Sequence, residues 1–326
     1  MGKRVIIDTD PGVDDALALL LAFKSYELHV EAITTVNGNV AVDQATRNAA
    51  LLLELLDPSP RPILAMGSVR AARKRPIRTQ SVHGPDGLGG LYRFKNRDGS
   101  PRYPDATLPV QIFDATEVFF DLLKRYPDEM SLIMLGPLTN LAEALKKDPR
   151  RVKGLREVVI MGGAIGVPGN ITPGAEFNIF MDPQAAHRVF HSGLPMTLVP
   201  LDVTERVCLE SEEIKALARI MEEPLGGFVR DITGRSIAYT REARGMSAIY
   251  LHDPLAVGVA IDPTMVKSAD LHVEVETSRG ITYGMIIADT RAISNSLKPP
   301  NLDVALEVES ELFLTFFKER LCQRSW

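Results

Sequence analysis

Four aspartates lie close together near the start of the chain, in the segment DTDPGVDDA at residues 8–16. They are Asp8, Asp10, Asp14 and Asp15. A single aspartate here would need no function, because an acid at a helix start commonly caps the helix or offsets its dipole. Four carboxylates this close repel one another unless a cation or bound protons offset their charge. Hard oxygen ligands of this kind suit calcium or magnesium, so the segment predicts a metal site.

The flanking sequence predicts a strand, a tight turn and a helix around these acids. The apolar run at residues 5–7 precedes Asp8, Pro11-Gly12 favours the turn, and an apolar helical pattern begins at Val13. Asp14 and Asp15 then fall in the first helical turn, where the dipole favours negative charge. The acids therefore converge at the carboxyl end of a first strand, which is where open α/β sheets bind ligands.

The rest of the chain continues as an alternation of strands and helices. We expect strands at 28–36, 62–66, 131–135, 157–161 and 195–200, helices at 42–56, 111–126 and 138–147, a polar helical pair over 211–244, strands at 271–277, 283–288 and 301–308, and a last helix at 310–321. This order predicts an α/β fold with an open, mostly parallel, doubly wound (Rossmann-like) sheet, an added helical segment and a small β extension. We expect a single catalytic domain over 1–326.

Two irregular stretches carry polar groups that could reach the same rim of the sheet. Residues 67–109 are rich in Gly, Pro and charge, and His83 lies there in a glycine-rich run that could close over a site or form an ordinary surface loop. After the strand at 157–161, the amide and carboxylate groups of Asn170, Glu176 and Asn178 precede the next helix.

Two Asp-Pro pairs have the form of a helix N-cap followed by the first helical residue. For Asp182, capping explains the sequence sufficiently. For Asp253 capping is also a fair interpretation, but His252-Asp253 could instead place a proton donor and a metal-binding carboxylate side by side.

Composition narrows the class of partner. The 326 residues are 45% hydrophobic, enough for a sizeable core, and a formal net charge of −5 gives no basic surface for nucleic acid. No apolar run approaches a membrane span, the N-terminus lacks a signal-peptide hydrophobic region, and the two cysteines have no metal spacing. We expect a cytoplasmic protein whose partner is a small molecule, with neither nucleic acid nor membrane.

The segment DTDPGVDDA resembles the signature of the inosine-uridine-preferring nucleoside hydrolases, and the likeness extends over most of the chain. Each further match is weak alone, but their joint order and spacing are specific. These matches are Asn37-Gly38-Asn39, His83-Gly84, Gly136-Pro137-Leu138-Thr139-Asn140, Met161-Gly162-Gly163, Asn170 with Glu176-Phe177-Asn178, and His252-Asp253-Pro254.

The resemblance implies a calcium-dependent enzyme that cleaves the N-glycosidic bond of ribonucleosides to free base and ribose. Asp10, Asp15, Asp253 and the main-chain carbonyl of Leu135 would hold Ca²⁺. By the same likeness, Asp10 would also be the general base on the metal-bound water, and Asp14 would accept a hydrogen bond from a ribose hydroxyl. Attack by water from the face opposite the base predicts inversion at the anomeric carbon.

The resemblance also assigns the rest of the site. Met161 would lie against the ribose face, and His252 would donate a proton to the leaving base, with Tyr239 or His83 able to assist. The groups expected to grip the remaining sugar hydroxyls are Asn39, Asn170, Glu176 and Asn178. Relatives commonly assemble, so we expect a homodimer or homotetramer.

The prediction of which nucleobase the enzyme prefers depends on the scarcity of tryptophan. Purine-specific relatives resemble a design in which tryptophans stack on the base, but the only tryptophan here is Trp326. We therefore expect a pyrimidine-preferring or broad enzyme. Two other readings stay open at this point: a Mg²⁺-dependent phosphohydrolase using Asp8-Thr9-Asp10, and a non-catalytic ribose or nucleoside binder with a structural metal.

Overall fold

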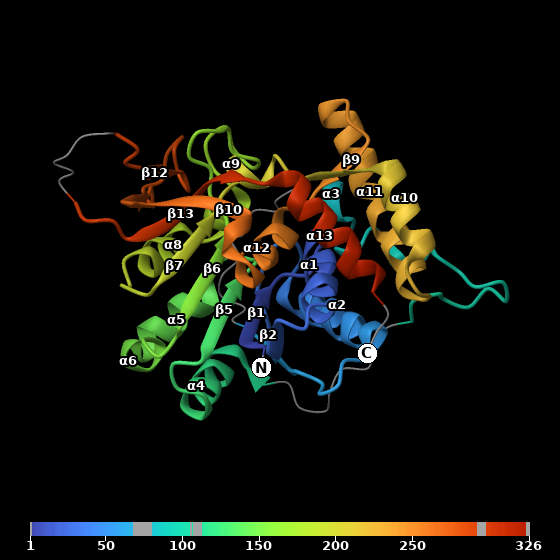
Figure 1. Ribbon diagram of the computed structural model, residues 1–326, viewed down its shortest axis with the longest axis horizontal. Helices are drawn as coiled ribbons and strands as arrows, with labels where there is room; N and C mark the ends of the chain where they lie inside the picture. The colour runs from blue at the N-terminus through green and yellow to red at the C-terminus, as the bar shows by residue number, and fades with distance from the viewer. Residues whose placement is uncertain (1, 68–79, 105, 107–112, 292–297, 324–326) are drawn as a thin grey trace.

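The computed structural model describes residues 2–67, 80–104, 106, 113–291 and 298–323. Within these residues the largest sheet has nine strands in the order β10-β13-β7-β6-β5-β1-β2-β3-β4 (Figure 1). Neighbouring strands are parallel, except that β10 runs antiparallel to β13. The predicted α/β class with a mostly parallel sheet is confirmed.

The strands of this sheet are β1 (Lys3–Thr9), β2 (Leu28–Thr35), β3 (Ile63–Met66), β4 (Phe113–Asp114), β5 (Met130–Met134), β6 (Glu157–Met161), β7 (Met196–Val199), β10 (Val266–Leu271) and β13 (Leu302–Val308). Two short antiparallel ribbons stand beside it, β8 (Cys208–Glu210) with β9 (Ala248–Tyr250), and β11 (Val273–Val275) with β12 (Ile286–Ala288).

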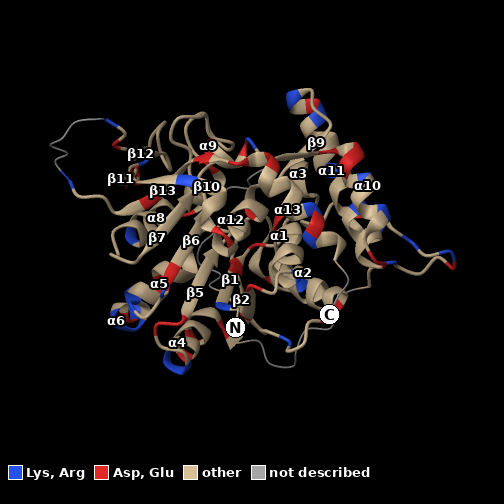
Figure 2. Ribbon diagram, viewed as in Figure 1, with Lys and Arg blue, Asp and Glu red and all other residues tan. Residues whose placement is uncertain are grey.

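Helices cover both faces of the sheet because its central strands are apolar on both sides. In β1, Val5 and Ile7 belong to one hydrophobic core and Ile6 to the other. The first core packs against α1 (Val13–Phe23), α2 (Val42–Leu56), α12 (His252–Ile261) and α13 (Ser310–Cys322). The second packs against α4 (Ala115–Arg125), α5 (Thr139–Lys147), α6 (Pro149–Val152) and α8 (Pro183–Phe190). In Figure 2 the central strands are mostly tan, the colour of uncharged residues, and most charged residues lie on outer helices and loops.

The remaining helices build the rim above the carboxyl ends of the strands and the added helical segment. They are α3 (Gln80–His83), α7 (Phe177–Met181), α9 (Leu201–Thr204), α10 (Ser211–Ile220) and α11 (Leu225–Arg244), with 3₁₀ turns at Leu91–Arg93 and Pro263–Met265. The polar pair α10 and α11 stands to one side of the sheet in Figure 1. None of the described helices combines the length and apolar character needed to cross a membrane.

Several expected boundaries were wrong. Helix α12 begins at His252 with Leu251 as its N-cap, because the Leu251 carbonyl already accepts from Leu255 N at 3.1 Å. Asp253 therefore does not cap this helix, whereas Asp182 does cap α8 as predicted. The strand expected at 271–277 is confined to β11, and β10 just before it was missed, as were β4 and the β8–β9 ribbon. Residues 111–112 of the helix expected at 111–126, and 68–79 of the irregular stretch, lie outside the described residues.

The order of the strands reverses at β1. Strands β2, β3 and β4 follow on one side of it, and β5, β6 and β7 on the other. Ligands bind at the carboxyl ends of the strands around such a switch point. The four N-terminal acids therefore occupy the position in this sheet that the topology reserves for a ligand.

Candidate active site

A cavity of about 340 Å³ opens above the carboxyl ends of β1, β5 and β6. Its walls come from the loops after the parallel strands, from α11 and from the start of α12. Most residues predicted for the site line it, namely Asp14, Asn39, His83, Leu135, Met161, Asn170, Glu176, Asn178, Tyr239, His252 and Asp253. Asp10 and Asp15 do not line the cavity and are fully buried.

Asp10 is held between two glycine-containing turns. Its Oδ2 accepts the Asn39 main-chain N–H at 2.5 Å, while Oδ1 is buried and makes no hydrogen bond. A Cβ added at Gly38 would lie 1.9 Å from Oδ2, and one added at Gly136 would lie 2.5 Å from Oδ1. The close packing fixes the carboxylate from both sides, and burial followed by the charge of Asp15 raises its pKa well above the ordinary value.

Asp15 is held by the turn that precedes its own helix. Oδ1 accepts from Thr9 Oγ1 at 2.5 Å, and Oδ2 accepts from Gly12 N at 2.9 Å and from Asn39 Nδ2 at 3.1 Å. Burial, and after it the charge of Asp14, raises the pKa of Asp15. The same side chain thus closes the start of α1 and faces the acids of the cavity.

Asp14, Asp15 and Asp253 bring one carboxylate oxygen each to within 4.8 Å of one another. Burial raises the pKa of Asp14 to about 6, and burial together with the charges of Asp14, Asp15 and Asp10 raises the pKa of Asp253 well above normal. Asp10 is outside this group of three but is close enough to act on Asp253. The like charges of these aspartates raise one another's pKa values, and no lysine or arginine of the described residues offsets them there.

These groups suit a metal ion. Three buried oxygens make no hydrogen bond within the described part of the chain, Oδ1 of Asp8, Asp10 and Asp14. Unsatisfied buried oxygens and raised carboxylate pKa values are the features that a hard cation would relieve. Asp8 is the most enclosed: its Oδ2 accepts from Thr34 Oγ1 at 2.5 Å and Asn140 Nδ2 at 2.7 Å, and burial raises its pKa to about 7. It supports the strand end from beneath.

The opposite wall is built on the Gly162-Gly163 turn and α7. Glu176 caps α7, accepting from Asn178 N at 2.8 Å and Ile179 N at 3.1 Å, and it also accepts from Gly163 N at 2.9 Å. Gly163 has φ +84°, a conformation that favours glycine. The carboxylate of Glu176 is thus satisfied by main chain and fixes the wall.

Asn178 and Asn170 are oriented by their own neighbours. Asn178 Nδ2 donates to the Leu135 carbonyl at 2.7 Å and to the Met161 carbonyl at 3.2 Å, which leaves its amide oxygen for the cavity. Asn170 Oδ1 accepts from Phe177 N at 2.8 Å. The Leu135 carbonyl, which was predicted to bind the metal, therefore lies at the cavity wall. It contacts Asn178, which was predicted to bind the sugar.

Two histidines face the cavity as neutral rings. His83 Nδ1 accepts from Val13 N at 3.1 Å, so the ring carries its proton on Nε2, and burial lowers its pKa to about 4. His252 Nδ1 lies 2.7 Å from Thr204 Oγ1, and burial, with the nearby charge of Arg244, lowers its pKa to about 3. Tyr239 comes from α11 and is 40% exposed, at the mouth of the cavity.

Sequence reasoning missed an aromatic and cationic stack beside His252. The Tyr250 ring stacks on His252 with centroids 5.5 Å apart, and Arg244 lies 4.9 Å from the Tyr250 centroid. Glu205 and Tyr250 hold the guanidinium through hydrogen bonds of 2.6 and 3.1 Å. Arg244 and Tyr250 line the cavity, as does Phe177. Tyr250 could have been predicted from its position two residues before His252. Arg244 could not, because it belongs to a helix that was interpreted as solvated.

Comparison with known proteins agrees with this geometry. A family model described as inosine-uridine preferring nucleoside hydrolase matches residues 5–315. The chain belongs to this family. It is a nucleoside hydrolase, an enzyme that acts on N-glycosyl bonds, as the sequence resemblance predicted.

Individual relatives match this nucleoside hydrolase over nearly its whole length. It is 34% identical over 326 residues to the pyrimidine-specific ribonucleoside hydrolase RihA of Enterobacter sp. (strain 638), covering 100% of this chain and 99% of the relative. The structure of the plant nucleoside hydrolase PpNRh1 superposes with a TM-score of 0.89 at 34% identity, covering 99% and 100% of the two chains. A purine-preferring ribonucleoside hydrolase from Gardnerella vaginalis gives 0.87 at 32% identity, covering 98% of each.

Proposed function

We propose that this nucleoside hydrolase is a calcium-dependent enzyme that releases the base from ribonucleosides by inverting attack of water. The observation that carries the proposal is the buried carboxylate floor, in which Asp10, Asp14 and Asp15 meet Asp253 from the far end of the chain. Asp10, Asp15, Asp253 and the Leu135 carbonyl would hold the ion. When bound, calcium would anchor sugar hydroxyls and make a water more acidic.

Asp10 is proposed as the general base. Its Oδ2 is occupied by the Asn39 N–H, so the free Oδ1 is the atom that takes the proton from the attacking water. The glycines on either side prevent the carboxylate from rotating away. A carboxylate already fixed in one orientation loses little conformational entropy in reaching the reacting geometry.

The sugar is proposed to bind between this floor and the α7 wall. Asp14, Asn39, Asn170, Glu176 and Asn178 would hold its hydroxyls, with Met161 against the ribose face. Departure of the base leaves an oxocarbenium-like sugar, and the surrounding carboxylates and amide oxygens stabilise that positive charge as it develops.

The leaving base needs a proton or a hydrogen bond, and His252 is proposed to supply it. In the free cavity the ring is neutral, so it serves first as an N–H donor from Nε2 if Nδ1 accepts from Thr204. Tyr239 and His83 are the other donors on this side. The Tyr250 ring behind His252 fixes the plane of the imidazole.

Pyrimidine or broad base preference is part of the proposal. The name of the RihA relative is pyrimidine-specific, and that of the Gardnerella structure is purine-preferring. The described cavity is lined by the smaller rings of Phe177, Tyr239 and Tyr250, and Trp326 lies outside the described residues. The absence of a larger indole ring from this lining supports a preference for the smaller pyrimidine bases.

We propose the whole chain as the unit of function, as one cytoplasmic catalytic domain that assembles as a homodimer or homotetramer. The family match over 5–315 and the place of β13, near the C-terminus, inside the main sheet support one domain. Assembly and location follow from the family resemblance alone.

Substitution of Asp10 tests the proposal. Asp10→Asn should lower kcat for uridine by about 10²–10⁴-fold, the usual contribution of a general base. Asp121→Asn on α4, where the aspartate pairs with Arg125 at 2.8 Å, removes the same charge far from the cavity and should leave kcat unchanged. Wild-type activity that survives calcium chelation, or full activity of Asp10→Asn, would contradict the proposal.

The substrate panel separates the alternatives. Uridine and cytidine should be hydrolysed at least as fast as inosine, and activity confined to guanosine would refute the base preference. A nucleoside binder would release no base from any of them. A phosphohydrolase would release phosphate from nucleotides with magnesium.

A further inference from the structure

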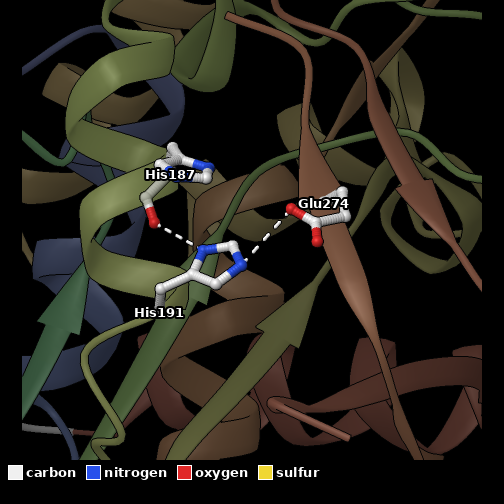
Figure 3. Close-up of side chains that lie close together, drawn as sticks. All are labelled: His187, His191 and Glu274. Carbon is white, nitrogen blue, oxygen red and sulfur yellow. Dashed lines mark hydrogen bonds and ion pairs between the residues drawn. The ribbon is translucent and has the colours of Figure 1, made fainter. Parts of the chain in front are cut away.

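A second cluster of metal-binding side chains lies outside the cavity, between α8 and β11. His187 and His191 are four residues apart, so they project from the same side of the helix and its C-cap. Val273 and Val275 are buried, and the alternation of the strand therefore turns Glu274 outward over α8. Figure 3 shows the three side chains facing one another.

The hydrogen bond of His191 determines which ring nitrogen is free. Its Nδ1 lies 2.8 Å from the His187 carbonyl, and a carbonyl only accepts, so Nδ1 carries the proton. In the neutral ring Nε2 then presents a bare lone pair, and this atom lies 3.3 Å from Glu274 Oε2. A lone pair facing a carboxylate oxygen is unfavourable unless a cation or a proton stands between them.

His272 repeats this arrangement on the other oxygen of the same carboxylate. Its Nδ1 lies 2.8 Å from the Pro299 carbonyl, and its Nε2 lies 2.9 Å from Glu274 Oε1. Lys298 also binds Oε1, so that oxygen has a cationic partner, while Oε2 faces only His191 among the contacts described for it. Histidines that donate Nδ1–H to a carbonyl and direct Nε2 at a ligand position are typical of metal sites.

The spacing suits a tetrahedral ion. Ligand bonds of about 2.0–2.1 Å at a tetrahedral angle separate neighbouring donor atoms by about 3.3–3.4 Å. The distance from His191 Nε2 to Glu274 Oε2 is 3.3 Å, and a donor of His187 lies within 4.8 Å of both. The His187 ring makes no hydrogen bond to any described residue and lies beside the His191 ring, with centroids 4.3 Å apart and planes tilted by 37°. It is free to turn toward the shared position.

We propose that His187, His191 and Glu274 form a zinc-class transition-metal site, with water as the remaining ligand. Imidazole nitrogen favours such ions over calcium, so the site differs in ion as well as in place from the carboxylate floor. It joins the β11–β12 ribbon to α8. Ile286 of that ribbon packs against Gly163, where an added Cβ would lie 2.3 Å from the isoleucine, so the bound ion secures the segment behind the cavity wall.

Calorimetric titration of the untagged, calcium-saturated protein with zinc tests the proposal. One zinc ion per chain should bind, and His187→Ala and His191→Ala should each weaken it by about tenfold or more. His29→Ala is the matched control, because His29 is a partly exposed histidine 3.3 Å from Glu31, and no second histidine of the described chain pairs with that carboxylate. It should bind zinc as the wild type does.

Cobalt provides a readout that a change in folding alone would not reproduce. Co²⁺ in the wild type should give the intense visible absorption of a tetrahedral nitrogen and oxygen site, and His191→Ala should lose it. Zinc affinity equal in wild type and both histidine variants, or zinc binding abolished by excess calcium, would overturn the proposal. Neither measurement depends on hydrolase activity, so the metal site and the proposed function are tested independently.

Discussion

Gly38 provides a steric test of the position of the proposed base. In Gly38→Ala the new Cβ would lie 1.9 Å from Asp10 Oδ2, whereas real Cβ atoms essentially never approach below 3.0 Å. The carboxylate or the 37–40 turn must therefore move by more than an ångström, and the hydrogen bond from Asn39 N must break. The φ of Gly38 is not in the left-handed region, so the backbone itself accepts alanine.

The expected cost follows from that displacement. A misplacement of about 1 Å at a reacting group lowers the rate by about 10²-fold, which corresponds to about 2.7 kcal/mol of transition-state stabilisation. The assay is kcat/KM for uridine hydrolysis at saturating calcium, with circular dichroism to show that the variant folds. Gly280→Ala is the matched control, because nothing lies within 4 Å of its added Cβ. A folded Gly38→Ala enzyme with unchanged kcat/KM would refute the reasoning.

Two further predictions concern stability. Burial lowers the pKa of His252 from about 6.5 in the unfolded chain to about 3 in the folded one, so the stability contributed by the neutral ring is fully present above pH 6.5 and is lost as pH falls toward 3. Between pH 7.5 and pH 4.5 the wild type should lose about 2.7 kcal/mol of unfolding free energy in urea relative to His252→Gln, since the buried aspartates titrate in both proteins. An identical pH slope in the variant would contradict this. Glu176→Gln should lower the free energy of unfolding by about 2–3 kcal/mol, because the amide presents a donor to main-chain N–H groups of Gly163, Asn178 or Ile179 that need an acceptor; an unchanged urea midpoint would argue against that role.

The sequence predicts the repeating part of this fold well. Helix α2 and strand β6 have the predicted bounds, because apolar periodicity and turn residues mark both of their ends. The short ribbon β8–β9 was missed, since strands of three residues carry too little periodicity to separate them from loops. The sequence left open whether Asp253 caps α12 or faces the acids, because its contact with Asp15 comes from the other end of the chain and no local pattern encodes it.

The candidate site was predictable where residue type alone limits the chemistry. Clustered aspartates and the family resemblance selected the carboxylate floor and the amide wall. The Arg244 and Tyr250 stack was not predicted, because its role depends on how α11 packs beside α12. The pair His187 and His191 was also passed over, since its third member, Glu274, is brought in by tertiary packing.

The place of β13 in the sheet also has a consequence for synthesis of the chain. Strand β7 ends at Val199, but the neighbour that covers its outer edge begins only at Leu302. At about 5–20 residues per second, that edge waits roughly 5–20 s on the ribosome with its main-chain hydrogen-bonding groups unpaired. Exposed edges of this kind pair readily with other chains. A stalled or truncated product ending before Leu302 should therefore be recruited by chaperones or aggregate, although its carboxylate cluster, including Asp253, has already been made.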